Sequence, residues 1–147
     1  FNRNALIYSL VAYLILYLVL TAYSYAFQIS PPEEFIKLMQ ATPFVLNFLM
    51  VVIGAPIVEE LLFRGFLFSQ LKTTKLGING SIILTSLIWT SIHLQYDLFL
   101  LIPIFLLGLL LGYLMHKYNS LYLVIIVHAV HNLQATLFIE FFYDYFY

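Results

Sequence analysis

Residues 56–65 read Pro-Ile-Val-Glu-Glu-Leu-Leu-Phe-Arg-Gly and place three charged side chains inside a long apolar stretch. Of the 147 residues, 63% are hydrophobic and 9% are charged, and the mean hydropathy is +0.98. Soluble domains are about 45–50% apolar and about 25% charged. The composition therefore predicts an integral membrane protein, in which charges at this position need a specific reason.

Apolar stretches recur along the whole chain, separated by short polar or proline-containing segments. A membrane-spanning helix needs roughly 20 mostly apolar residues. The candidate spans are residues 5–27, 43–71, 81–94, 98–117 and 121–142. The first is too long for a signal peptide and lacks a small-residue cleavage site, so we interpret it as a span. Residues 33–40 read as a short interfacial helix or a loop.

These stretches predict an all-α fold, a polytopic transmembrane bundle of about five spans that forms a single domain over residues 1–147. The second span is expected to be bent or broken near Pro56, because proline removes a backbone hydrogen bond. Basic residues favour cytoplasmic loops. With a cytoplasmic N-terminus, Lys37 alone among the basic residues falls outside, while the others fall inside: Arg3, Lys72, Lys75 and Lys117. Arg64 lies within a span.

Several functional classes are excluded or disfavoured. The net charge of −1 gives no basic surface for nucleic acid, and the absence of cysteine excludes disulfides and thiolate chemistry. No His-Glu-x-x-His motif is present, and no serine lies in a nucleophile-elbow context. No cofactor is expected. A zinc site built from Glu59, His93 and His128 on separate helices stays open.

The charges in the opening stretch divide into a pair and a single residue. Glu60 and Arg64 are spaced i, i+4, so they share a helix face and can form an ion pair. Glu59 points about 100° away and has no such partner. An ionisable residue inside a span is a candidate functional residue. Glu59 is therefore the candidate, and Glu60 and Arg64 are expected to support it.

Polar residues on two other spans reach a similar depth. At about 1.5 Å of rise per residue, Glu59, His93 and Asn132 lie roughly 17–18 Å from the inner ends of their spans, and His128 about 10 Å. His128 and Asn132 are spaced i, i+4 and share one face. His131 is ambiguous, because it lies about 100° off the face of Asn132. Three helices thus bring polar groups to one level.

A carboxylate with histidines in a membrane cavity suits the activation of water. Glu59 would take a proton from water as general base, and His93 would help to hold that water. His128 and Asn132 carry N–H donors that could stabilise the oxyanion formed when water attacks a peptide carbonyl. These four residues are the predicted catalytic set of a membrane endopeptidase.

Three motifs occur in order: Glu59-Glu60-x-x-x-Arg64, Trp89-x-x-x-His93 and His128-x-x-x-Asn132. Together they resemble the CPBP family, the CAAX-processing and bacteriocin-processing membrane endopeptidases also called the Abi family. The resemblance covers residues 56–132 and leaves the span over residues 5–27 outside. The second motif departs from the family in one respect, since its aromatic residue is commonly Phe and here is Trp89.

The resemblance implies a glutamate-dependent intramembrane endopeptidase with the same residue roles. It implies peptide or lipid-modified protein substrates, and a bacterial cell-membrane protein of peptide maturation, immunity or signalling. A membrane-protein partner stays open as well. Some members have lost catalytic residues and act as scaffolds, immunity factors or regulators; the presence of every motif residue argues against that alternative here. The family was once assigned to metallopeptidases, so a zinc-dependent version also stays open.

Overall fold

Every regular element is helical in the computed structural model, which describes residues 2–94 and 96–146. Some segments are π-helical, with wider turns than an α-helix, and carry η labels. In chain order the elements are α1 (Arg3–Phe27), α2 (Glu33–Ala41), α3 (Phe44–Asn47), η1 (Phe48–Gly54), α4 (Ala55–Glu60), η2 (Leu61–Leu67), α5 (Phe68–Leu71), α6 (Gly77–Ser91), α7 (Leu98–Tyr118), α8 (Leu121–Phe141) and α9 (Tyr143–Phe146).

Among the described residues, four helices are long and apolar enough to cross a membrane: α1, the continuous helix Phe44–Leu71 that comprises α3 to α5, α7 and α8. The fifth expected span corresponds to α6, which begins at Gly77 rather than Ser81 and ends at Ser91 rather than Leu94. Its 15 residues are about 22 Å long, which is shorter than a hydrocarbon core of about 30 Å. The prediction of an all-α membrane bundle is confirmed, with α6 as a short member.

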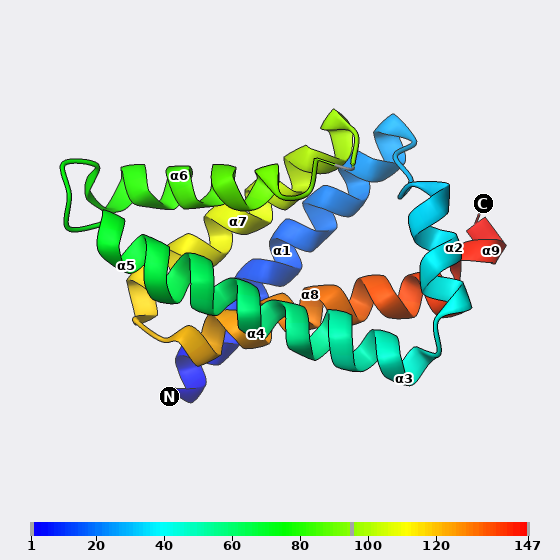
Figure 1. Cartoon of the computed structure of the whole chain (residues 1–147), viewed down its shortest axis with the longest axis horizontal. Coiled ribbons are helices and arrows are strands. Elements are labelled where there is room, and N and C mark those ends of the chain that lie inside the picture. The colour runs from blue at the N-terminus through cyan, green and yellow to red at the C-terminus, as the bar shows by residue number, and fades with distance from the viewer. Residues whose placement is uncertain (1, 95, 147) are drawn as a thin grey trace.

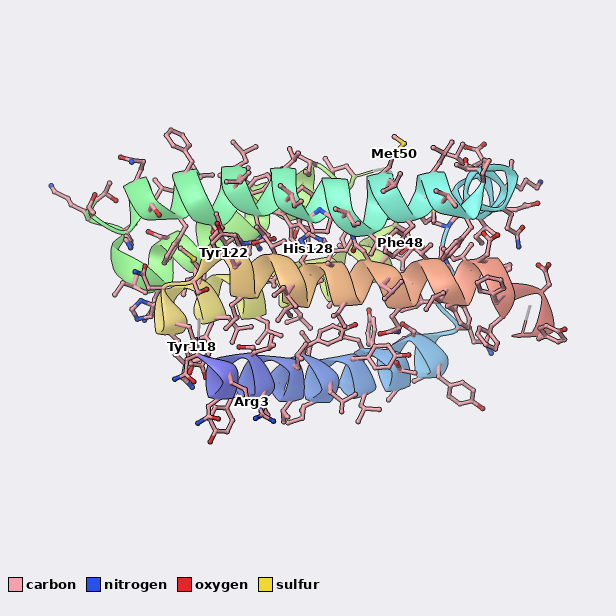
Figure 2. The ribbon with its side chains drawn as sticks, turned by 90° about the horizontal axis from the view of Figure 1, so that it is seen from below. Arg3, Phe48, Met50, Tyr118, Tyr122 and His128 are labelled. Carbon is pink, nitrogen blue, oxygen red and sulfur yellow. The ribbon has the colours of Figure 1, made fainter. Side chains whose placement is uncertain are left out.

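The helices alternate in direction between two ends of the bundle (Figure 1). The N-terminus, the α5–α6 turn and the α7–α8 turn lie at one end; the α1–α2 connection and the C-terminus lie at the other. Figure 2 shows α8 between the long α3–α5 helix and α1, and both of these contact it. His128 lies well inside the bundle on α8. Residues 33–40, for which the sequence left a short helix or a loop open, lie in the helix α2, which buries Ile36 and Met39.

Local capping sets where the last two spans begin. Asp97 accepts a hydrogen bond from the backbone N–H of Leu100 at 2.9 Å and starts α7. Ser120 accepts one from Leu123 at 3.4 Å and starts α8. Asn119 ends α7 in the left-handed region, with φ of 46°, which asparagine tolerates better than most residues. A two-residue connection thus turns the chain back into the bundle.

Close packing of α6 on α7 depends on the two glycines of the motif Gly108-Leu-Leu-Leu-Gly112. A Cβ added at Gly108 would lie 3.0 Å from Cβ of Ser86, and one added at Gly112 would lie 3.0 Å from Cγ2 of Ile82. Small residues let helix backbones approach closely in membranes. This contact fixes α6, and with it Trp89, against α7.

The interruption expected near Pro56 is a change of helix type rather than a loss of helical backbone. The chain is π-helical from Phe48 to Gly54 and returns to α-helix at Ala55. The backbone N–H of Ala55 donates to the carbonyl of Met50, five residues earlier, and Pro56 has no N–H. The carbonyl of Val51 is therefore left without a donor from its own helix.

Candidate active site

The two glutamates lie on a short α-helical segment between two π-helical ones. α4 ends at Glu60, and the π-helical η2 carries Arg64. Single π-helical turns within α-helices often occur at functional sites, because the wider turn rotates the residues that follow. Glu59 is twelve residues before the end of α5 at Leu71, which places it about 18 Å along the helix axis from that end.

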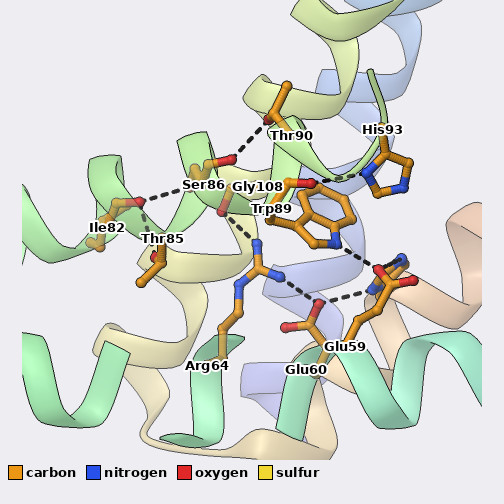
Figure 3. Close-up of polar contacts among 11 residues, drawn as sticks. Glu59, Glu60, Arg64, Ile82, Thr85, Ser86, Trp89, Thr90, His93 and Gly108 are labelled. Atoms are coloured by element: carbon orange, nitrogen blue, oxygen red, sulfur yellow. Dashed lines mark hydrogen bonds and ion pairs between the residues drawn. The ribbon is translucent and has the colours of Figure 1, made fainter. Parts of the chain in front are cut away.

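Glu60 is the centre of a fully buried charged network (Figure 3). Its Oε1 accepts from Nη1 of Arg64 at 2.7 Å and from Nδ1 of His128 at 2.8 Å. Nη2 of Arg64 donates to the carbonyl of Gly108 on α7 at 3.1 Å. The side chains of Glu60 and Arg64 have no exposed surface. The predicted ion pair is therefore present, and it joins the long helix to α7 and α8.

Glu59 differs from Glu60 in its surroundings, as the sequence predicts. Its side chain is 21% exposed. Oε2 accepts a hydrogen bond from Nε1 of Trp89 on α6 at 2.5 Å, and Nε2 of His128 lies 4.0 Å from the same oxygen. Within residues 2–94 and 96–146, the structure gives no hydrogen bond to Oε1. Glu59 is thus anchored through one oxygen, and the other is free to act.

His93 lies beside Trp89 but outside a helix. It follows the last residue of α6 by two positions, whereas the sequence placed it late within a span. Nδ1 of His93 lies 2.9 Å from the carbonyl of Trp89, and the two rings meet edge to face at 5.3 Å. A carbonyl can only accept, so Nδ1 carries the proton. In Figure 3 the His93 ring and the Glu59 carboxylate lie on the same side of the indole.

Asn132 lies one helical turn from His128, and its observed contact is with the backbone. Nδ2 donates to the carbonyl of Val51 at 2.8 Å. This is the carbonyl that Ala55 and Pro56 leave without a donor. Asn132 therefore holds η1 against α8, and its second amide hydrogen remains for another acceptor.

The other histidines do not join this cluster. His131 faces α1, where its Nδ1 lies 3.3 Å from the hydroxyl of Tyr13. That hydroxyl also donates to Oε1 of Gln134 at 2.7 Å. His116 is exposed near the end of α7, as expected for an interfacial residue. The ambiguity over His131 is therefore resolved in favour of helix packing.

A shared metal ion would have to use the donor atoms that other contacts leave unused. Across the described part of the chain, no group of three or more His, Asp or Glu side chains is arranged to hold one. Nδ1 of His128 is engaged by Glu60, and Oε2 of Glu59 is engaged by Trp89. Nε2 of His128 and Oε1 of Glu59 are not engaged in this way, so the His₂Glu zinc site considered from the sequence stays a prediction.

Comparison with known families places the chain. The family described as type II CAAX prenyl endopeptidase Rce1-like matches residues 41–134, which is more than half of the sequence. The chain belongs to this family. The Rce1-like family is part of the CPBP family, so the resemblance read from the three motifs is confirmed. No curated protein and no solved structure matches the chain.

Membership of the Rce1-like family identifies the class of protein to which this chain belongs. The family is one of CAAX proteases, and the apolar helices make the chain an integral membrane protein. All four predicted catalytic residues lie within the matched segment, while α1 lies outside it.

Two contacts in the Rce1-like site were not expected from the sequence. Trp89 was noted in the sequence only as a departure from the usual Phe, but its N–H binds Glu59 directly. The carbonyl of Gly108 was not singled out, yet it accepts from Arg64. The departure of Trp89 from the usual Phe was the available signal for the first contact. A backbone carbonyl leaves no comparable signal in a sequence.

Proposed function

We propose that this Rce1-like protein is a glutamate-dependent endopeptidase that hydrolyses peptide bonds within the membrane. Glu59 is the general base, His93 orients the water, and His128 and Asn132 stabilise the oxyanion. The observation that supports this most directly is the partly exposed Glu59 carboxylate, which lies beside His128 and Trp89 with one oxygen free.

The proton positions on the histidines support these roles. Because Nδ1 of His93 donates to the Trp89 carbonyl, Nε2 of the neutral ring is an acceptor. A water that gives one hydrogen to that nitrogen can give its other hydrogen to Oε1 of Glu59. Its oxygen lone pair is then directed at a substrate carbonyl, as general base catalysis requires.

His128 donates through Nε2 in its protonated form. Nδ1 is held by Glu60, so a second proton is needed for Nε2 to act as a donor. The unused amide hydrogen of Asn132 is the second donor.

The reaction balances with these groups alone. Water oxygen bonds to the peptide carbon, its proton moves to Glu59, and the carbonyl π electrons move to oxygen, where His128 and Asn132 donate. Collapse of the tetrahedral intermediate re-forms the carbonyl and breaks the C–N bond. Glu59 then returns its proton to the leaving amine. The products are a carboxylic acid and an amine.

The substrates we propose are peptides or lipid-modified proteins of the same membrane, in bacterial peptide maturation, immunity or signalling. The depth of Glu59, about 18 Å along its helix, favours a peptide that is itself held at the membrane. We place the protein in a bacterial cell membrane with the N-terminus in the cytoplasm, since the N-terminal end of the bundle carries Lys72, Lys75 and, in the last turn of α7, Lys117.

Peptide processing in host cells tests this function. Cells carrying the wild-type protein are compared with cells carrying Glu59→Gln, which keeps the shape and removes the base, and peptide termini are mapped by mass spectrometry. Glu34→Gln, an exposed carboxylate on α2, is the matched control. We expect precursor peptides to accumulate only with Glu59→Gln. Identical peptide patterns, with equal rescue of a deletion phenotype, would instead indicate a non-catalytic scaffold, immunity or regulatory protein.

A further inference from the structure

The single tryptophan of the chain, Trp89, lies at the centre of the candidate active site. Its side chain is buried, with 2% of the residue exposed. It contacts the proposed base, both histidines and the buried arginine, although no step of the proposed reaction uses it. A residue with these contacts is a candidate for controlling the geometry of the reaction.

The hydrogen bond from Trp89 to Glu59 has only one possible direction. An indole N–H can only donate, and the ionised carboxylate accepts through Oε2 at 2.5 Å. The terminal torsion of a glutamate is broad, so the carboxylate of Glu59 needs an external contact to fix its plane. Hydrogen bonds to a charged acceptor are about twice as strong as neutral ones. Trp89 therefore determines which oxygen of Glu59 is free.

The indole ring is itself held on all sides. The guanidinium of Arg64 lies 4.9 Å from the ring centroid, in a cation–π contact. The rings of His93 and His128 each meet it edge to face at 5.3 Å. Gly108 lies so close that an added Cβ would be 3.1 Å from Cε3 of the indole. The ring has little freedom to rotate.

Trp89 also acts on His93 through its backbone. Its carbonyl holds Nδ1–H of His93 at 2.9 Å, which leaves Nε2 as the acceptor for water. One residue of α6 thus orients both groups that are proposed to hold the attacking water. The contact with Glu59 joins two helices, because Trp89 is on α6 and Glu59 is on α4.

We propose that Trp89 is a positioning residue that fixes Oε2 of Glu59 through its indole N–H and leaves Oε1 as the proton-accepting oxygen. This inference rests on the proposed peptidase function and deepens it. Phenylalanine, the aromatic residue commonly found in this motif, has no N–H and cannot make this contact.

The first test follows the indole N–H itself. Because Trp89 is the only tryptophan among these 147 residues, ¹⁵N-indole labelling of this chain in detergent micelles gives one side-chain resonance. We expect a downfield proton resonance in the wild type that moves upfield in Glu59→Gln, where the charged acceptor is lost. Glu34→Gln is the control and leaves the resonance in place. If the chemical shift of the indole proton is unchanged in Glu59→Gln, the proposal is wrong. This result does not depend on whether the protein is a peptidase.

The second test uses the precursor peptide whose cleavage is lost in Glu59→Gln cells. Trp89→Phe should lower kcat between about 10-fold and 100-fold with KM unchanged, as for a slightly misplaced catalytic group. Replacing Trp89 with 3-benzothienylalanine, which keeps the bicyclic shape and substitutes sulfur for N–H, should do the same if the Phe variant fails to fold. If the sulfur analogue has the wild-type kcat while Glu59→Gln is inactive, the role proposed for Trp89 is wrong. The proposed peptidase function would still be supported by that result.

Discussion

His128 binds Glu60 through Nδ1 at 2.8 Å and turns its other ring nitrogen toward Glu59, 4.0 Å away. The two neighbouring glutamates therefore face different nitrogens of the same imidazole ring. Glu60 holds the ring in place, and Glu59 faces the nitrogen that remains. Arg64 binds the Glu60 oxygen that His128 binds, so the orientation of His128 depends on a buried ion pair.

Removing Arg64 should strongly destabilise the protein. Arg64→Met leaves Glu60 as an unpaired buried charge, and breaking a buried pair in this way costs about 3–5 kcal/mol. The double variant Glu60→Gln/Arg64→Met removes both charges and should recover part of that loss. Thermal unfolding in detergent micelles measures the difference. If the loss of stability in the double variant equals the sum of the losses in Glu60→Gln and Arg64→Met, the two charges are not coupled.

The chain contains a matched exposed pair that serves as control. Lys37 and Glu33 are also spaced i, i+4 and lie 2.6 Å apart, but both side chains are largely exposed. The hydrogen bond from Lys37 lowers the pKa of Glu33. Exposed pairs add little to stability, because solvent screens them. Lys37→Met should therefore leave the unfolding temperature unchanged.

Gly108→Ala should separate α6 from α7 and displace Trp89. The new Cβ would meet Ser86 at 3.0 Å and the indole at 3.1 Å, and overpacking of this kind costs about 1–3 kcal/mol. We expect lower stability, lower peptidase activity and a shift in the fluorescence of the single tryptophan. Gly80→Ala is the control, since its closest neighbours belong to the flexible side chain of Leu76. Unchanged fluorescence in Gly108→Ala would contradict this account of the α6–α7 contact.

Helix periodicity and composition were sufficient for much of this architecture. The spacing of Glu60 and Arg64 predicts their ion pair, because residues four apart share a helix face. Apolar length predicts the long helices, because the bilayer sets how many residues are needed. The divergence of Glu59 from Glu60 follows from the same period. These are local relationships, and a single sequence carries them.

Contacts between helices were harder to predict. The π-helical segments on either side of α4 depend on backbone hydrogen bonds, which the apolar pattern does not reveal. The bond between Trp89 and Glu59 needs the relative rotation of α4 and α6. The partner of Asn132 is a backbone carbonyl that is free only because η1 is π-helical and Pro56 lacks an N–H. Pro56 can be read from the sequence, but the π-helical hydrogen-bonding pattern before it, which leaves the carbonyl without a donor, cannot.

The proposed orientation can be tested with single cysteines, because the chain has none of its own. Lys75→Cys lies in the α5–α6 turn and Glu34→Cys in α2, at opposite ends of the bundle. With the N-terminus in the cytoplasm, a membrane-impermeant thiol reagent added to intact cells should label Glu34→Cys alone. In inverted vesicles it should label Lys75→Cys alone. The reverse pattern would establish the opposite orientation.

Asn132 should stabilise the protein through the carbonyl that Pro56 leaves free. Asn132→Leu leaves the Val51 oxygen unpaired, at a cost of about 1–3 kcal/mol. Pro56→Ala restores an N–H to the helix, so the same Asn132 substitution should cost much less in that background. Thr136→Val, one turn further along α8, is the control, because its buried hydroxyl has no partner among the described residues. Additive unfolding energies for positions 56 and 132 would show that Asn132 does not compensate for the proline.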